Sequence, residues 1–384
     1  MVDSSKLFQK YKLNNNVEVP GLIVVAPLTL FGSNPDGSVS KQEKEYLNQR
    51  ATNIGMYILG ATAVSQEGIT FITQPRALSE KDIPALEERA KIIKEQGSLA
   101  INQIHHGGYL ANSKYSGIPV RAVSAGIDNS EIKKDKDIYS NEKNYVEFSD
   151  EEIRRVIDDF GRATELSLKA GYDGIEIHGA NNYLLQQFYS EHTNKRTDDW
   201  GGSLEKRMKF PLAVVDACCK IRDKYNKPEF IIGYRLSPEE PFEDGITMTE
   251  TMKLIRELIK KPIQFIHLSE RNYFQETRRG EGKGIPRLKV IHDEIKGKVA
   301  LIGLGGLYTD EDFNKALNSG YSDFIGTGRA SMLNKDLGIL LKEGKGDKLN
   351  LKLDPEHPEI YSIPDFLWNM CIQNQSWLPP VQNK

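Results

Sequence analysis

The sequence predicts an α/β protein built as a (β/α)8 TIM barrel, and two observations support this fold class. Eight short runs rich in Ile, Val, Leu and Phe recur along the chain with little polar alternation. Such runs are typical of strands buried on both faces of a parallel sheet. A helical pattern follows each run, and eight strand–helix units favour a closed barrel over an open doubly wound sheet, which remains the alternative.

The strands and helices can be assigned in chain order. Strands are expected over residues 21–28, 56–61, 99–104, 174–177, 230–236, 265–268, 299–302 and 324–325. Helices are expected over residues 40–54, 82–96, 150–170, 204–225, 248–260, 286–295, 310–319 and 331–342. The helix at 150–170 is the clearest, because Ser149 and Glu152 have capping-box spacing at its start and Gly171 follows its end.

Two segments break this alternation. Residues 107–149 form a long polar insertion after the third strand, with a Lys-rich run at 131–137. Because it follows the carboxyl end of a strand, we expect it to overhang the active-site face. Residues 346–384 extend past the last helix. We therefore expect a barrel over 1–345 and a C-terminal extension that packs on the barrel or forms an oligomer interface.

Composition and charge exclude several classes of protein. The formal net charge is -3 and the lysines are spread along the chain, so neither a nucleic acid nor an anionic membrane is an expected partner. Three cysteines, Cys218, Cys219 and Cys371, are too few for a disulfide framework or a four-cysteine metal site. The first residues lack the apolar core of a signal peptide, and no apolar stretch approaches about 20 residues. We expect a cytoplasmic protein.

Two glycine-rich segments, 303–306 and 326–329, follow the seventh and eighth strands. In this fold, the loops at these strands commonly bind a phosphate, and Gly306, Gly328 and Arg329 carry the backbone and charge for it. The alternative is that the glycines only make tight turns. The second segment lacks the third glycine of a dinucleotide motif. We therefore expect a firmly held mononucleotide, with NAD(P)H as a transient substrate.

Polar side chains follow the fourth and fifth strands. His178 and Asn181 can donate two hydrogen bonds to one carbonyl oxygen, and Tyr183 can act as a general acid. Arg235 ends a buried strand and requires an anionic partner, such as a reduced flavin. The alternatives are a core histidine, a turn asparagine, a tyrosine on an apolar wall and an internal salt bridge. No metal is expected, because His105 and His106 are neighbours on a strand and point in opposite directions.

Two longer stretches resemble a known family. Residues 173–188 read DGIEIHGANNYLLQQF, close to the family pattern IHxAxGYLxxxF. Residues 194–210 read NKRTDDWGGSLEKRMKF, close to NxRTDxYGGSxENRxRF. Over about residues 5–345 the chain resembles the Old Yellow Enzyme family of FMN-dependent ene-reductases, of the NADH:flavin oxidoreductase type.

This resemblance implies a role for each site residue. The expected cofactor contacts of a tightly bound, non-covalent FMN are Ala26, Pro27, Leu28, Thr29, Ala61, Gln103, His178, Arg235, Gly306, Gly328 and Arg329. The expected substrate contacts are Phe31, His178, Asn181 and Tyr183. In the implied reaction, NAD(P)H passes hydride to flavin N5, and the flavin passes it to the β-carbon of an α,β-unsaturated carbonyl or nitro compound. Tyr183 donates the proton, with His178 and Asn181 holding the carbonyl oxygen.

The chain departs from the family pattern at several positions. Asn182 stands where Gly is usual, but Asn tolerates a left-handed backbone, so we expect the turn to survive. Trp200 and Tyr109 stand where the family has Tyr and Arg, and we expect them to reshape the pocket. Two other functions remain open. A sugar-phosphate lyase or isomerase would need a Schiff-base lysine at a strand end, where none is apparent, and a non-catalytic flavin-binding protein would show no turnover.

Overall fold

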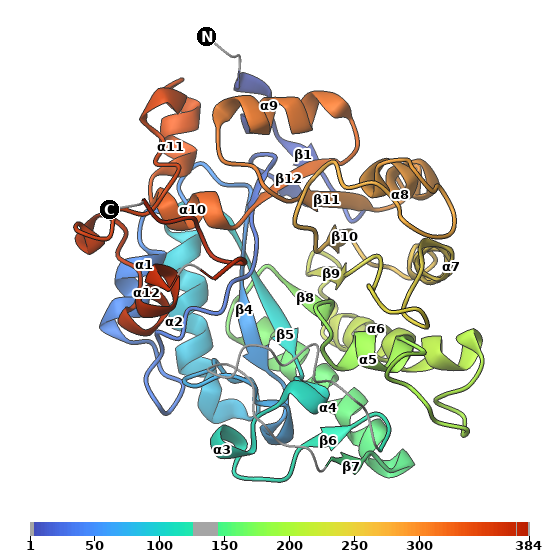
Figure 1. Ribbon diagram of the computed structural model, residues 1–384. Helices are drawn as coiled ribbons and strands as arrows, with labels where there is room; N and C mark the ends of the chain where they lie inside the picture. The colour runs from blue at the N-terminus through green and yellow to red at the C-terminus, as the bar shows by residue number, and fades with distance from the viewer. Residues whose placement is uncertain (1–3, 126–144, 374, 383–384) are drawn as a thin grey trace.

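The computed structural model describes residues 4–125, 145–373 and 375–382. Its central sheet is a closed parallel barrel in the order β10-β11-β12-β3-β4-β5-β8-β9, so the predicted fold class is confirmed (Figure 1). The barrel strands are β3 (Ile23–Val25), β4 (Met56–Ala63), β5 (Leu99–His105), β8 (Gly174–Gly179), β9 (Ile231–Leu236), β10 (Phe265–Leu268), β11 (Ala300–Leu304) and β12 (Phe324–Thr327). The Lys-rich run at 131–137 lies outside the described residues.

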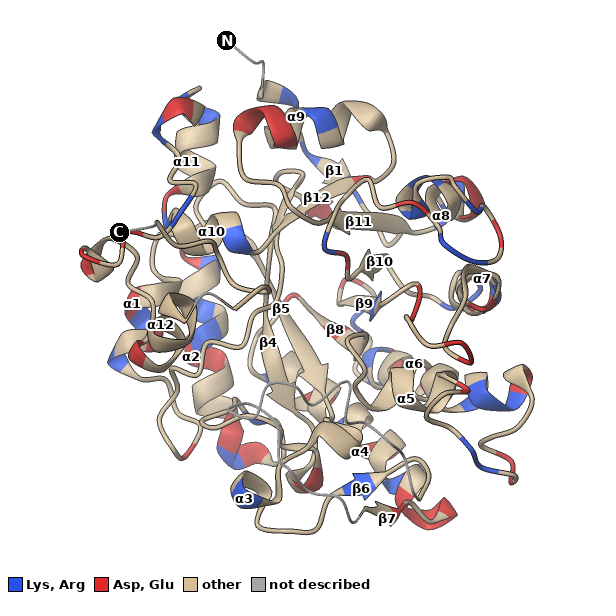
Figure 2. Cartoon of the chain, in the orientation of Figure 1, with Lys and Arg blue, Asp and Glu red and all other residues tan. Residues whose placement is uncertain are grey.

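Helices follow the barrel strands and surround them (Figure 1). They are α1 (Lys41–Leu47), α2 (Ile83–Lys94), α4 (Asp150–Lys169), α6 (Leu204–Lys224), α7 (Met248–Leu258), α8 (Arg287–Ile295), α9 (Asp310–Ser319), α10 (Arg329–Leu333) and α11 (Leu337–Lys342). The predicted capping box of α4 is present: the Ser149 hydroxyl accepts from the Glu152 N–H, and the Glu152 carboxylate accepts from the Ser149 N–H. Figure 2 shows both signs of charge interspersed over these helices and the loops.

Two predicted helices were wrong in extent. The helix expected at 40–54 stops at Leu47, because Gln49 and Asn53 have φ of 69° and 59°, outside the helical region. The helix expected at 331–342 is two helices. Between them, Asn334 donates to the Asn350 carbonyl at 3.0 Å and accepts from the Asn350 N–H at 2.7 Å. This side-chain pairing with a distant segment replaces the continuous helix.

Several short elements were not predicted. They are β1 (Tyr11–Lys12), β2 (Glu18–Val19), α3 (Ser113–Ser116), β6 (Arg121–Ala122), β7 (Val146–Glu147), α5 (Leu184–Tyr189) and α12 (Asp365–Ile372). The β1–β2 hairpin closes the amino-terminal end of the barrel. Its Asn14 amide donates to the Ile263 and Lys298 carbonyls, which precede β10 and β11, and its Leu13 joins the apolar core inside the barrel.

The described part of the C-terminal extension packs beside α1 (Figure 1). Gln42 of α1 donates to the Asp365 carboxylate at 2.6 Å, and the Arg50 guanidinium donates to the Tyr361 carbonyl. The ring of Phe366 lies 5.0 Å from that of Phe31, in the segment after β3. The extension therefore reaches the carboxyl-terminal face of the barrel.

Alternate residues of each strand point into the barrel, and their chemistry changes along the strands. Near the amino-terminal ends they are apolar and form one core cluster with the N-terminal hairpin; Ile101, Ile231 and Phe265 are examples. Toward the carboxyl-terminal ends they are polar. We call the set Gln103, Glu176, His178, Arg235 and His267 the inner polar ring. All five are buried, and His178, Arg235 and His267 are direct register partners on β8, β9 and β10.

Among the described residues, no helix has the length and apolarity needed to cross a membrane. Within the same described ranges, no group of three or more His, Cys, Asp or Glu side chains is arranged to hold a metal ion.

Candidate functional site

Three rings pack together at the carboxyl ends of β5 and β8. Tyr183, directly before α5, meets His105 nearly edge-on, with ring centroids 4.4 Å apart and an interplanar angle of 85°. His178 lies 5.0 Å from Tyr183 and 5.3 Å from His105. The fold thus brings together two predicted catalytic residues, His178 and Tyr183. It adds His105, which the sequence analysis considered only as a metal ligand.

Both histidines of this cluster are neutral at physiological pH. Burial lowers the pKa of His105 to about 3. Burial, followed by the nearby His105, Arg235 and His267, lowers the pKa of His178 well below its ordinary value. The Ala180 N–H donates to His178 Nδ1 at 3.3 Å, so the single ring proton is assigned to Nε2. His178 can therefore donate one hydrogen bond from Nε2 without carrying a charge.

Asn181 is positioned by two serines that directly follow the neighbouring strands β9 and β10. Its side-chain oxygen accepts from the Ser269 hydroxyl at 2.8 Å, and its backbone N–H donates to the Ser237 hydroxyl at 3.0 Å. Because the oxygen is held in this way, the exposed amide presents its NH2 group as a donor. Asn181 and Asn182 have φ of 57° and 61°, so the prediction that Asn182 would adopt a left-handed conformation is confirmed.

Glu176 and His267 belong to the site but were missing from the sequence prediction. The Glu176 carboxylate accepts from the Gln103 amide at 2.7 Å and pairs with His267 Nδ1 at 2.6 Å. Two signals in the sequence could have identified them. Glu176 precedes His178 by two residues and so shares its face of the strand. The tripeptides Arg-Leu-Ser at 235–237 and His-Leu-Ser at 267–269 end consecutive strands in the same way.

Arg235 is buried, and no described carboxylate forms an ion pair with it. It is 7% exposed, it forms no ion pair with a described residue, and its Nε has no hydrogen-bond partner there. The internal salt bridge that the sequence left open is therefore not formed within the described ranges. Two other buried atoms, His105 Nδ1 and His267 Nε2, also lack a hydrogen-bond partner among the described residues. Since buried donors and acceptors are almost always paired, this group of atoms fits a polar ligand such as a flavin ring.

The two glycine segments differ in whether their backbone conformation requires glycine. Gly305 and Gly306 have φ of 134° and 67°, so this turn itself requires glycine. Gly328 has a negative φ, and a Cβ there would have no atom within 4 Å. The guanidinium of Arg329 lies 5.2 Å from the Tyr308 ring, and Arg329 has no acidic partner in the described chain. The open space at Gly328 and a cation without an acidic partner among the described residues fit a phosphate.

The remaining predicted cofactor contacts lie near the same face. Ala26 and Ala61 are buried, whereas Pro27, Leu28 and Thr29 are half-buried. A Cβ on Gly60 would lie 2.8 Å from the Gln103 side chain and 3.4 Å from that of Pro27. Pro27 and Gln103 therefore approach each other across Gly60, between β3 and β5.

The predicted substrate contact Phe31 is joined to Tyr183 by one intervening ring. Phe31 meets Phe71 edge-on at 5.7 Å, and Phe71 in turn meets Tyr183 edge-on at 6.2 Å. The ring of Phe366 of α12 also contacts that of Phe31, with ring centroids 5.0 Å apart. The cluster therefore has an apolar aromatic wall that extends to the C-terminal extension.

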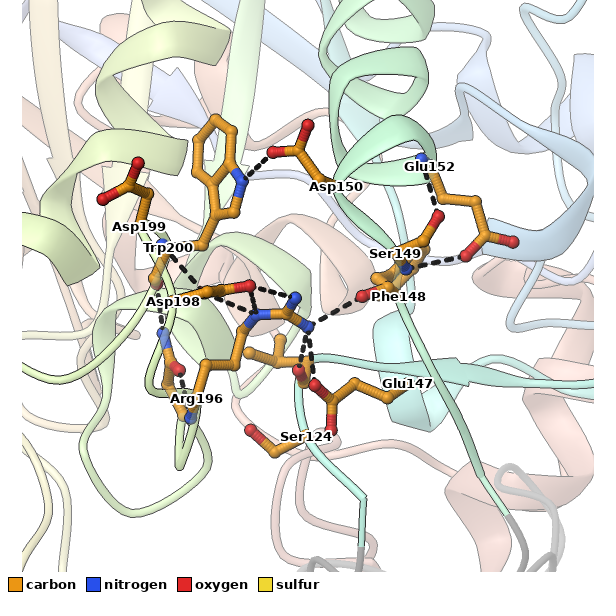
Figure 3. Close-up of polar contacts among 12 residues, drawn as sticks. Ser124, Glu147, Phe148, Ser149, Asp150, Glu152, Arg196, Asp198, Asp199 and Trp200 are labelled. Atoms are coloured by element: carbon orange, nitrogen blue, oxygen red, sulfur yellow. Dashed lines mark hydrogen bonds and ion pairs between the residues drawn. The ribbon is translucent and has the colours of Figure 1, made fainter.

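The second family-like stretch, 194–210, forms a structural clamp (Figure 3). Arg196 donates to the Val123 and Phe148 carbonyls at 2.9 and 2.8 Å, and it forms ion pairs with Glu147 and Asp198. The clamp thus joins both described ends of the insertion, before residue 126 and after residue 144, to the segment before α6. We call Arg196 and these partners, together with Trp200 and Asp150, the Arg196 clamp.

The expectation that Trp200 reshapes the pocket is not supported by its contacts. Its indole N–H donates to the Asp150 carboxylate at 2.7 Å and its backbone N–H to Asp198 at 3.0 Å, so it belongs to the Arg196 clamp (Figure 3). Tyr109 is fully buried, and its backbone N–H donates to the Gln187 side chain at 3.1 Å.

Comparisons with known proteins agree with this arrangement. The model of the NADH:flavin oxidoreductase / NADH oxidase family matches residues 6–348. The chain is 35% identical over 374 residues to a probable NADH-dependent flavin oxidoreductase, YqiG, of Bacillus subtilis, and the match covers 97% of each protein. It is 32% identical to an NADH:fumarate oxidoreductase of Klebsiella pneumoniae over 97% of this chain, but it spans only 39% of that protein's length.

Among solved structures, the chain is similar to an Old Yellow Enzyme homologue from Zymomonas mobilis. The TM-score is 0.74 at 28% sequence identity, and the match covers 94% of this chain and 99% of the other. Because the family model spans most of the chain, and the barrel has the fold of these relatives, this protein belongs to the NADH:flavin oxidoreductase / NADH oxidase family, the Old Yellow Enzyme family.

Proposed function

We propose that this chain binds FMN without a covalent bond at the carboxyl ends of the barrel strands. The proposal rests chiefly on the buried Arg235, whose Nε has no partner among the described residues. Arg235 and Gln103 would hold the pyrimidine edge of the flavin, and the segment 26–29 and Ala61 would line its ring. Gly306, Gly328 and Arg329 would hold its phosphate. When bound, FMN supplies hydride exchange between NAD(P)H and a second substrate.

We further propose that the second substrate is an activated alkene, either an α,β-unsaturated carbonyl or a nitro compound. His178 Nε2 and the Asn181 amide offer two donors to one substrate oxygen, which favours the charge that develops there during hydride addition. Tyr183 would deliver the proton to the carbon next to that oxygen-bearing group. The name of the Klebsiella relative, an NADH:fumarate oxidoreductase, supports an alkene conjugated to a carbonyl-type group.

The rings around Tyr183 would exclude water from the reacting atoms. Phe31, Phe71 and His105 are all buried, and each contacts another ring of the cluster. A dry wall strengthens the hydrogen bonds that His178 and Asn181 make to a substrate oxygen.

Cofactor binding tests the first half of the proposal. The purified protein, supplied with FMN, should retain it through gel filtration and absorb as a flavoprotein. Without oxygen, NADH or NADPH should bleach this absorbance, and an alkene such as a cyclic enone should restore it. Protein that neither retains FMN nor takes it up would contradict the proposal.

Tyr183→Phe tests the second half. We expect the rate of alkene-dependent reoxidation to fall by about 100-fold, because a positioned general acid contributes about this much or more. The rate of flavin reduction by NAD(P)H should not change. Tyr189→Phe is the matched control, because this buried tyrosine of α5 donates to the Glu250 carbonyl instead. Equal losses in both half-reactions of Tyr183→Phe would contradict the acid role.

A further inference from the structure

The inner polar ring contains a carboxylate to which the proposed function gives no role. Glu176 is fully buried, and its two oxygens are held by Gln103 Nε2 at 2.7 Å and His267 Nδ1 at 2.6 Å. A buried carboxylate is costly, so such a group is retained where its charge or its hydrogen bonds are needed.

The first consequence of this arrangement is orientation. Because the Gln103 amide nitrogen donates to Glu176, its carbonyl oxygen is the atom directed toward Gly60, 2.9 Å from where a Cβ would lie. Burial lowers the pKa of His267, more than Glu176 raises it, so this ring is neutral. With its proton on Nδ1 toward Glu176, His267 keeps an unpaired Nε2 inside the barrel.

The second consequence is electrostatic. Glu176 lies on β8 one inward-facing position below His178, and His178 is the register partner of Arg235. Its negative charge therefore opposes the positive field of Arg235 in a region closed to water, where charges interact strongly. Arg235 alone would favour electron uptake by a flavin, because reduction adds negative charge. Glu176 offsets part of that effect.

We propose that Glu176 is a positioning residue that sets the reduction potential of the bound flavin. It orients Gln103 and His267, and its charge makes the flavin harder to reduce than Arg235 alone would. This inference rests on the proposed binding of FMN. It predicts that loss of the Glu176 charge raises the midpoint potential.

The test is spectroelectrochemical titration of the FMN-loaded protein. Glu176→Gln keeps the shape of the side chain and can still pair with Gln103. We expect the equilibrium to shift about tenfold toward reduced flavin, a rise of about 30 mV for a two-electron couple. Glu176→Asp keeps the charge and should remain within about threefold of the wild-type equilibrium, which corresponds to about 15 mV.

Two further variants keep the test decisive. Glu43→Gln removes a different buried carboxylate, the partner of Arg89 in the α1–α2 contact, and should leave the potential unchanged. If Glu176→Gln does not fold, the double variant Glu176→Gln/His267→Gln, in which two amides can pair, carries the same expectation. An unchanged or lower potential in either folded, flavin-loaded variant overturns this inference alone. A wild-type protein that holds no FMN overturns the proposed function, and the inference with it.

Discussion

Two arginines, Arg196 and Arg235, are buried to the same extent but differ in the number of hydrogen bonds and ion pairs that they form with the protein. Their exposed fractions are 8% and 7%. Every guanidinium nitrogen of Arg196 donates to a carbonyl or a carboxylate in the Arg196 clamp (Figure 3). Arg235, in the inner polar ring, has no ion pair and an unpartnered Nε among the described residues.

This difference distinguishes arginines that stabilise the fold from an arginine that is available to a ligand. Arg89 and Arg207 are also buried, and like Arg196 they are bound by carboxylates and carbonyls outside the barrel. A fully paired arginine stabilises the chain by itself, whereas an unpaired buried arginine is tolerated only if something else completes its hydrogen bonds. The comparison predicts that the Arg196 clamp is needed for stability and the inner polar ring for the cofactor.

Mild acid should destabilise the protein through its buried histidines and not through the Arg196 clamp, and this is the largest effect we expect. Burial lowers the pKa of His105 to about 3 and that of His106 to about 4, and it lowers that of His178 well below 6.5. The unfolded chain takes up protons near pH 6.5 and the folded chain does not, so stability falls as pH falls from 7 to 5. His105 and His106 each contribute roughly 2 kcal/mol over that range, and His178 acts in the same direction.

One buried carboxyl group has the opposite effect on the free energy of unfolding. Burial raises the pKa of Glu270 to about 7, so this group adds stability as pH falls toward 5 and reduces the net loss. The Arg196 clamp should not respond, because hydrogen bonds from Arg196 keep the pKa of Asp198 below its ordinary value. Urea unfolding at pH 7, 6 and 5 measures the effect, and a flat profile would contradict the neutral state of the three histidines.

Arg196→Met should reduce the free energy of unfolding by about 3 kcal/mol, because it leaves buried carbonyls and the Asp198 and Glu147 carboxylates without their donor. The flavin midpoint potential should not change in the folded protein. Arg154→Met is the matched control: this exposed arginine pairs with Asp150 of the same clamp, and its loss should change the free energy of unfolding far less than Arg196→Met does. Equal losses in the two variants would remove the distinction between the two regions.

Arg235→Met should weaken the binding of FMN and leave the stability of the protein nearly unchanged. We expect the Kd for FMN to rise about tenfold, or about 1.4 kcal/mol, because a buried charge that faces the ligand is lost. The stability of the FMN-free protein should change by less than about 1 kcal/mol, since no hydrogen bond from Nε to the described chain is broken. FMN titration by fluorescence and urea unfolding measure the two quantities. A loss of stability as large as that of Arg196→Met would show that Arg235 serves the scaffold.

The smallest expected effect concerns Trp200. Trp200→Phe removes the hydrogen bond to Asp150 and should lower the free energy of unfolding by about 1 kcal/mol. The relative rates with a panel of enones and nitroalkenes should remain those of the wild type. A changed acceptor preference would instead restore the expectation, drawn from the sequence, that Trp200 shapes the pocket.

Much of the fold could be predicted because its signals are local. The apolar runs marked all eight barrel strands, and the Ser149–Glu152 spacing marked the start of α4 correctly. The single helix expected over 331–342 failed for a tertiary reason. Asn334 forms hydrogen bonds with Asn350. A local pattern of apolar residues cannot predict a hydrogen-bond partner sixteen residues away.

The residues of the candidate site also fall into those with a local sequence signal and those without one. The sequence predicted roles for His178, Asn181, Tyr183 and Arg235, because each follows or ends a recognisable strand and the flanking motif resembles a known family. It did not identify Glu176 as a site residue. Within the motif this side chain was assigned only to the strand, and its importance comes from contacts elsewhere.

Local patterns in the sequence were enough to predict the barrel, the order of its strands and helices, and the residue types at the strand ends, because periodicity and capping depend on neighbours a few residues apart. Which buried polar groups have hydrogen-bond partners could be read only from the folded chain. Glu176 is separated from Gln103 by 73 residues and from His267 by 91. Whether a buried charge is paired, and so whether it serves the scaffold or a ligand, depends on partners that only folding brings within hydrogen-bonding distance.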